Sequence, residues 1–171
     1  FKPTDQLSFA LDVQQIWYSD VDAIGNTNQL TQMCDVGAAF GQSNFGGTYD
    51  ASYCLGGSNG AGFGWKDATV IKLGVQYAIN PEWTVRAGYS HMNQIISGTE
   101  VPFNVLAPAV ITDHWTIGLT TKGAKNYEIT GWAMYAPEET VSGASAFTAG
   151  STHSISMKQY EVGIAFSWLF N

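Results

Sequence analysis

The chain has 171 residues, of which 12% are charged, 13% are aromatic and 19 residues are glycine, with a formal net charge of -7 and a pI near 4.6. An average soluble domain is about 25% charged, so this surface is poorly suited to water, and the acidic balance excludes the basic stripe that nucleic acid requires. No stretch approaches the roughly 18 consecutive apolar residues of a membrane helix, so only strands could cross a bilayer.

The N-terminus, Phe1-Lys2-Pro3-Thr4-Asp5, has neither a charged n-region nor an apolar h-region and is therefore no signal peptide. We expect that a signal was removed or that the chain starts within a longer protein. Residues 2–5 are typical of the remnant of a tight turn.

Six segments alternate apolar and polar residues with period two, the pattern of strands that have one apolar face. In chain order they are predicted at residues 7–18, 68–79, 83–92, 113–121, 127–135 and 160–171. The last is the clearest, with aromatic and aliphatic residues on one face from Tyr160 to Phe170 and polar or small residues on the other. Aromatic residues at both ends of a span of about ten residues indicate a tilted transmembrane β-strand.

Charged residues within these strands fall on the polar face. On the lipid face, one Lys or Arg at the midplane would cost about 2–4 kcal/mol, so a bilayer enforces this segregation. The predicted luminal polar residues are Asp12, Lys72, Gln76, Arg86, His114, Glu128 and Glu161.

The connections alternate in length. Residues 80–82 and 122–126 form tight turns, whereas 19–67, 93–112 and 136–154 are long. Outer-membrane barrels have short periplasmic turns and long extracellular loops, so this alternation predicts that topology, with the C-terminus in the periplasm. A soluble β-sandwich, the alternative, explains neither the low charge nor its segregation.

Six strands are too few to close a barrel, since the smallest membrane barrels have about eight and an open edge in hydrocarbon is costly. The predicted fold is therefore all-β, an antiparallel transmembrane β-barrel of which residues 1–171 form the C-terminal part, with 19–67 as a long extracellular loop. Assembly from several short chains is the alternative. We expect contacts with outer-membrane lipids, and with the barrel-assembly machinery through the C-terminal strand.

Both cysteines, Cys34 and Cys54, lie in the first long loop. The periplasm through which such a loop passes is oxidising, so a disulfide is predicted, two free thiols being the alternative.

Motifs for chemistry are scarce. The glycine-rich run 56–64 fits neither a dinucleotide fingerprint nor a P-loop and is predicted to be a loop. His91, His114 and His153 are dispersed, so neither a metal site nor a cofactor is indicated. A hydrolase would need a Ser near the one His on a polar strand face, His114. A purely structural or adhesive barrel is the other alternative to transport.

Short motifs in a fixed order give the chain a family resemblance. They include Pro3-Thr4-Asp5-Gln6-Leu7, Leu11-Asp12-Val13-Gln14, Tyr18-Ser19-Asp20-Val21, Gly62-Phe63-Gly64-Trp65-Lys66-Asp67, Arg86-Ala87-Gly88-Tyr89-Ser90 and Glu100-Val101-Pro102-Phe103-Asn104-Val105-Leu106-Ala107-Pro108. With these the chain resembles the C-terminal part of the FadL/TodX family of outer-membrane transporters for long-chain fatty acids and aromatic hydrocarbons. The resemblance implies a barrel of fourteen strands, an N-terminal hatch, and passive passage of a hydrophobic small molecule. It also implies a lateral opening in the barrel wall and no catalytic residues.

Two sets of residues are candidates for ligand contact. A hairpin pairing with indices summing to about 162 puts Gln76 opposite Arg86, where a cation suits a fatty-acid carboxylate. Alternatively, the luminal cations pair with Asp12, Glu128 or Glu161, or with the hatch. The second set is an apolar run in a loop that is otherwise polar, and it either lines a ligand path or plugs the barrel mouth. Its members are Val101, Phe103, Val105 and Leu106.

Overall fold

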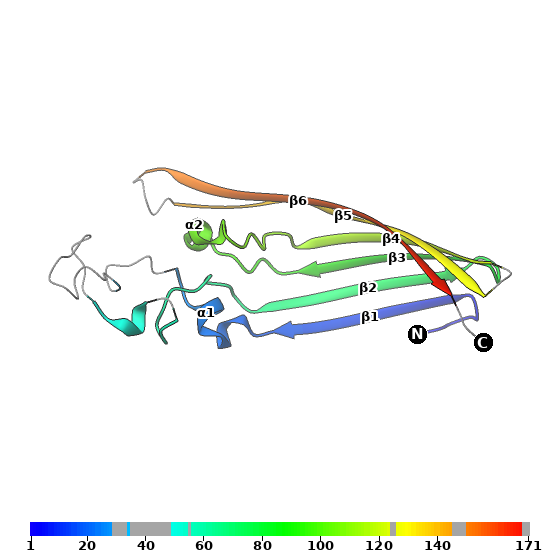
Figure 1. The fold of residues 1–171 in the computed structure, drawn as a ribbon, viewed down its shortest axis with the longest axis horizontal. Coiled ribbons are helices and arrows are strands. Elements are labelled where there is room, and N and C mark those ends of the chain that lie inside the picture. The colour runs from blue at the N-terminus through cyan, green and yellow to red at the C-terminus, as the bar shows by residue number, and fades with distance from the viewer. Residues whose placement is uncertain (29–33, 35–48, 55, 124–125, 145–149, 169–171) are drawn as a thin grey trace.

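The computed structural model describes residues 1–28, 34, 49–54, 56–123, 126–144 and 150–168. These residues form a six-stranded antiparallel sheet in which strands that follow each other in the chain lie side by side (Figure 1). The strands are β1 (Leu7–Ile16), β2 (Ala68–Ala78), β3 (Trp83–Met92), β4 (Asp113–Gly123), β5 (Tyr127–Ala144) and β6 (Thr152–Trp168). The predicted all-β, antiparallel character is confirmed.

Short helical turns gather at one end of the sheet, and the N-terminus and the end of β6 lie at the other end (Figure 1). These turns are η1 (Tyr18–Asp20), α1 (Asp22–Gly25), η3 (Ala51–Tyr53), η4 (Gly98–Glu100) and α2 (Val101–Asn104). In the part of the chain that the structure describes, no helix is long and apolar enough to span a membrane.

Strand register places most of the large apolar residues of the six strands on one face, here called the apolar face. One row of directly opposed residues crosses the whole sheet, namely Leu11, Leu73, Tyr89, Trp115, Tyr135 and Tyr160. Leu11, Val162 and Ile164 are 69%, 82% and 77% exposed. Large aliphatic side chains this exposed over a continuous surface require an apolar environment to cover them.

Aromatic side chains flank this apolar surface at both ends. Toward the long connections, the Tyr89 and Trp115 rings lie 4.4 Å apart and the Tyr135 and Tyr160 rings 5.1 Å apart. At the opposite end, the Tyr127 ring stacks on Phe166 at 5.9 Å and on Trp168 at 6.4 Å, and Trp83 is the first residue of β3. Aliphatic residues between two aromatic rows are the arrangement of a sheet whose face meets a lipid bilayer.

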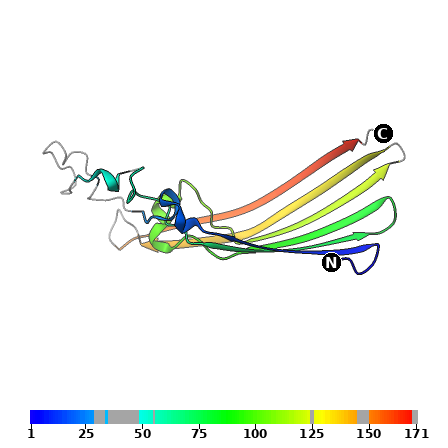
Figure 2. The ribbon, with the colours of Figure 1, turned by 90° about the horizontal axis from the view of Figure 1, so that it is seen from below.

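The sheet is open at both sides. Among the described residues, β1 pairs with β2 and β6 pairs with β5, and neither has another strand along its outer edge. At the β1 edge, Phe1 and Phe9 exchange two hydrogen bonds, from each N–H to the other carbonyl, at 2.9 and 2.8 Å. Figure 2 shows that the sheet is bent, as expected of a segment of a closed surface.

The last hairpin is longer than predicted, because most of the expected loop 136–154 is strand. β5 extends to Ala144 and β6 begins at Thr152. A register shift between Ala136 and Glu139 changes which β5 residues face which side. Beyond it, the face that was apolar carries hydroxyl pairs, Thr140 with Ser156 at 2.7 Å and Ser142 with Ser154 at 2.8 Å. The apolar alternation that predicts strands stops here, so the sequence pattern resembles a loop. Elsewhere β1 ends two residues earlier than predicted and β4 two later, and the predicted residues 169–171 lie outside the described part.

The connection 93–112 folds onto the polar face at the mouth of the sheet, the end that carries the long connections. Its Ile95, Ile96, Val101 and Val110 are buried against Ile155 of β6, in a cluster that also takes in Ala68. The turn η4 lies so close to β5 that a Cβ added at Gly143 would stand 1.6 Å from the Gly98 carbonyl oxygen. This packing makes the mouth the hydrophobic core of the described chain.

Candidate functional site

Arg86 stands on the polar face between neutral partners. Gln76 lies directly opposite it, as predicted from the hairpin pairing. The Arg86 Nε donates to Gln76 Oε1 at 2.7 Å, and its Nη1 donates to Thr120 Oγ1 at 2.6 Å. A guanidinium has five N–H donors, so most remain for a further acceptor, and within the described residues no carboxylate forms an ion pair with Arg86.

The other predicted luminal charges mostly pair with adjacent strands. Lys72 Nζ lies 3.3 Å from Asp12 Oδ2, and Lys122 Nζ lies 3.2 Å from Glu128 Oε1. These are contacts between neighbours in the sheet, not contacts across a lumen. Glu161 lies opposite Met134, and it is exposed on the polar side.

A pocket of about 400 Å³ lies at the mouth, between the end of the connection 93–112 and the polar face. We call it the mouth pocket, and its walls are formed by Trp65, Met92, Ala107, Pro108, Ala109, Ile111, His114, Met157 and Gln159. Most of this lining is apolar, and its two methionines adapt readily to differently shaped ligands. His114 and Gln159 supply the few polar groups that a binding pocket uses for orientation.

His114 also borders a smaller pocket of about 180 Å³ further along the polar face, here called the inner pocket. Its lining includes Lys72, Ser90 and Thr116. His114 therefore separates an apolar compartment from one that contains a cation. This is the one predicted His on the polar face, and it stands opposite Ser90 in the sheet.

The four apolar loop residues predicted as path or plug divide between two environments. Val101 is fully buried in the mouth core, and Phe103 is half-buried against Phe63 with ring centroids 5.1 Å apart. Val105 and Leu106 are 63% and 74% exposed. None of the four lines the mouth pocket, which begins at the next residue, Ala107.

A hydrogen bond fixes the roof of the mouth pocket. The Trp65 indole Nε1 donates to Asn104 Oδ1 at 2.6 Å, and the Asn104 amide donates to the carbonyls of Phe63 and Glu100 at 2.7 and 2.9 Å. Asn104 is fully buried, so these contacts satisfy a side chain that would otherwise be costly. They join the end of the first long connection to the second.

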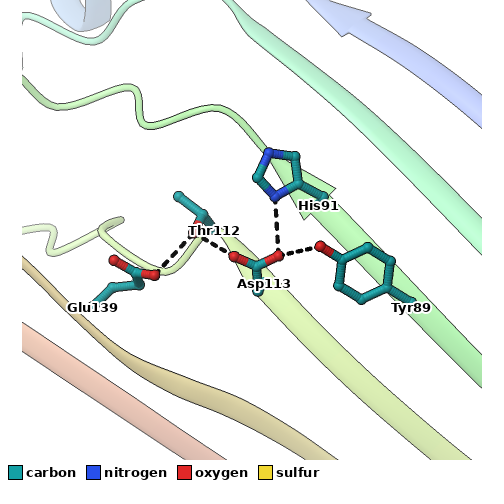
Figure 3. A network of polar contacts seen from close by, with 5 residues as sticks. All are labelled: Tyr89, His91, Thr112, Asp113 and Glu139. Carbon is teal, nitrogen blue, oxygen red and sulfur yellow. Dashed lines mark hydrogen bonds and ion pairs between the residues drawn. The ribbon is translucent and has the colours of Figure 1, made fainter.

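A polar network lies where β3 and β4 meet the connection 93–112 (Figure 3). Asp113 accepts hydrogen bonds from the Tyr89 hydroxyl and Thr112 Oγ1, and lies 3.0 Å from His91 Nδ1. The Thr112 hydroxyl, which has one proton, also lies 3.4 Å from Glu139 Oε1 as the longer, alternative contact. Tyr89 belongs to the aromatic row of the apolar face and also contributes to the lining of the inner pocket. Asp113 shares the phase of Trp115, so it is a strand charge that departs from the predicted placement on the polar face.

The predicted disulfide is confirmed, since Cys34 and Cys54 are bonded, with a Cα–Cα distance of 5.0 Å. Near it, Asp50 caps η3 by accepting hydrogen bonds from the Ser52 backbone N–H and hydroxyl. The hydroxyl and then the backbone contact lower the pKa of Asp50 below its usual 3.8. Asp67 accepts the same two kinds of bond from Ser19, and the backbone contact is the main cause of its lowered pKa.

Sequence reasoning missed Met92, Met157, Trp65 and Ile111 as pocket residues. Met157 lies on the same face of β6 as Gln159 and Glu161. An apolar residue on this polar face could have indicated an apolar pocket from the sequence alone. Trp65 and Ile111 lie outside the strands, where no periodicity indicates the direction of a side chain.

In the described part of the chain, no three His, Cys, Asp or Glu side chains gather as a metal-binding group. A search of curated proteins and a search of solved structures found no match for the chain. The family model described as Outer membrane protein transport protein (OMPP1/FadL/TodX) matches residues 1–105. That match covers more than half of the chain and includes β1 to β3 with the connections around them. The chain therefore belongs to the OMPP1/FadL/TodX family of outer membrane transport proteins.

Proposed function

We propose that residues 1–171 are the C-terminal part of a larger outer-membrane barrel with fourteen strands, the number implied by its resemblance to the FadL/TodX transporters. Hydrophobic compounds pass through this barrel without a chemical step. The FadL/TodX family transports hydrophobic substrates across the outer membrane. The apolar face between its aromatic rows suits contact with membrane lipids. In this arrangement the long connections are extracellular, the C-terminus is periplasmic, and the last strand engages the assembly machinery.

The observation that carries the proposal is the mouth pocket. An apolar cavity that opens on an otherwise polar face is suited to a hydrophobic solute, because the solute leaves water there. Long-chain fatty acids and aromatic hydrocarbons are the proposed substrates. For a fatty acid, the carboxylate would compete with Asp12 for the Lys72 ammonium in the inner pocket, while His114 borders both compartments.

Replacing Met157 with Asp tests the path. Met157 lines the mouth pocket, and a charge buried in an apolar passage costs several kcal/mol. In cells that lack their own transporter and produce the full-length protein, uptake of a labelled fatty acid and of a neutral hydrocarbon should fall by about tenfold or more.

Ser156→Asp is the matched control, because Ser156 is the preceding residue of β6 and faces the opposite side, where it contacts Thr140. It should leave uptake unchanged. Met157→Trp keeps the site apolar but fills part of the pocket. It should slow uptake of the bulkier of the two substrates more than uptake of the smaller one. If Met157→Asp reaches the surface normally and transports both compounds at the wild-type rate, the mouth pocket is not the path.

A further inference from the structure

A carboxylate is buried where the two long connections meet. Glu100 is only 6% exposed. Its Oε2 accepts a hydrogen bond from the Asn28 backbone N–H at 2.6 Å, and its Oε1 accepts one from Thr99 Oγ1 at 3.3 Å. An ionised carboxylate has about four acceptor positions, and Glu100 forms no ion pair within the described residues. A buried negative charge with so few partners is unfavourable unless a cation balances it.

Asn28 provides a second acceptor without a partner. Its Oδ1 is fully buried and receives no hydrogen bond from the residues that the structure describes. Since the Asn28 backbone contacts Glu100 directly, this oxygen and the carboxylate belong to the same small region. A buried amide oxygen of this kind costs about 1–3 kcal/mol if it stays unsatisfied. In the described part of the chain, the Glu100 carboxylate and Asn28 Oδ1 are therefore two buried acceptors with no cationic partner.

The backbone encloses this region closely. Gly64 has a φ of +63°, and a Cβ there would stand 2.4 Å from Glu100 Cγ, 2.5 Å from Cδ and 2.7 Å from Oε2. The Gly64 backbone thus lies directly against the carboxylate, with its N–H bonded to the Asn26 carbonyl at 2.8 Å. Three segments that are far apart in the sequence meet here, around Asn28, Gly64 and Glu100.

We propose that Glu100 and Asn28 bind one Ca²⁺, which ties the first long connection to the second above the mouth pocket. Ca²⁺ prefers oxygen ligands, takes carboxylate, amide and backbone carbonyl oxygens together, and tolerates irregular geometry. The proposed site has one carboxylate and otherwise neutral oxygen ligands. It is therefore compatible with the absence of a group of three His, Cys, Asp or Glu side chains among the described residues. The site concerns the connections alone and does not depend on the proposed transport path.

Calorimetric titration of the full-length protein in detergent, after removal of divalent ions with EDTA, measures the binding. Wild type should bind one Ca²⁺ with a Kd of roughly 0.1–1 mM, the range of extracellular modules with few charged ligands. Glu100→Gln removes the charged ligand and should weaken binding at least about tenfold. Glu138→Gln, which removes an exposed carboxylate from β5, should change nothing. Heat-dependent gel mobility confirms that each variant is folded.

Asn28→Asp separates the proposal from a metal-free arrangement in which the Asn28 amide simply turns to donate to Glu100. With a bound cation, the added carboxylate should tighten Ca²⁺ binding about tenfold and make the two connections more resistant to protease when Ca²⁺ is present. Without one, two carboxylates repel each other, and protease cleavage should increase whether or not Ca²⁺ is added. That second result, or equal titrations of wild type and Glu100→Gln, overturns the proposal.

Discussion

The Asp67 carboxylate fixes the point where the first long connection returns to the sheet. One of its oxygens accepts from the Ser19 backbone N–H at 2.9 Å and from the Ser19 hydroxyl at 2.7 Å. Because Ser19 lies just after β1 and Asp67 just before β2, this contact closes the base of a connection of about fifty residues. Both bonds favour the ionised form, which explains the lowered pKa of Asp67.

The sign of this shift predicts an acid-sensitive contact. The pKa of Asp67 is lower in the folded chain than its usual 3.8, so the contact stabilises the fold above that value and weakens as pH falls through the folded pKa. Hydrogen exchange of the peptide containing Ser19, corrected for the intrinsic rate, should accelerate below about pH 4. Asp67→Asn keeps an acceptor that does not titrate, so this acceleration should disappear, whereas Asp50→Asn should retain it. The same pH profile in wild type and Asp67→Asn would refute the assignment.

At the scale of elements, the hairpin of β5 and β6 spans two environments. Below the register shift its outward residues are apolar and aromatic, and above it they are hydroxyl pairs. Lys158 stands at the change, with its Nζ 5.4 Å from the Tyr160 ring centroid and 5.8 Å from that of Tyr135. A cation over aromatic faces at the edge of an apolar band is suited to the boundary between hydrocarbon and headgroups.

The disulfide between Cys34 and Cys54 stabilises the first long connection, residues 19–67. It links residues separated by 20 positions, and closing a loop of this length stabilises it by about 3 kcal/mol in the chain-entropy model. Replacing both Cys34 and Cys54 with Ser should speed protease cleavage within residues 19–67 and leave the strands intact. Reduction of the wild type serves as the control and should give the same cleavage rate. An unchanged rate would mean that other contacts, such as the one between Ser19 and Asp67, hold the connection by themselves.

At the scale of the whole molecule, the open edges of β1 and β6 are the dominant feature. Among the described residues neither edge has a neighbouring strand, and apart from the Phe1–Phe9 bonds at β1 the outer backbone groups have no strand partner there. In hydrocarbon every unpaired group costs several kcal/mol. The exposed apolar face is also unfavourable in water, because nothing apolar covers it there. We therefore expect the sheet to be stable only in a membrane and with further strands along its two edges.

Expressed alone, residues 1–171 should not form a closed monomeric barrel. The expected result is the absence of heat-modifiable gel mobility and of full protease resistance, because both edges stay unpaired. The complete reading frame, folded under the same conditions, is the control and should show both properties. A protease-resistant, heat-modifiable monomer of the isolated chain would show that six strands suffice.

The sequence alone predicted the sheet and the faces of its strands. Side chains alternate with period two and a lipid-facing surface tolerates almost no charge, so the positions of Asp12, Lys72 and Arg86 identify the polar face without coordinates. A short turn likewise fixes its register, which is why the pairing of Gln76 with Arg86 could be predicted. The part of the β5–β6 hairpin above the register shift was not predicted, because its outward residues are hydroxyl residues and the sequence there lacks the alternation of apolar and polar residues that indicates a strand.

Only the tertiary structure determined which residues of the connection 93–112 are buried at the mouth. The connection 93–112 has no repeating pattern, so which of its residues are buried depends on where it meets β5, β6 and Trp65. Val101 is in the core, Leu106 is exposed, and the pocket wall begins at Ala107. The meeting of Asn28, Gly64 and Glu100 is similarly invisible in the sequence. Contacts between distant segments depend on long-range packing, whereas alternation along a strand is local, and only the local signal can be read from the chain by itself.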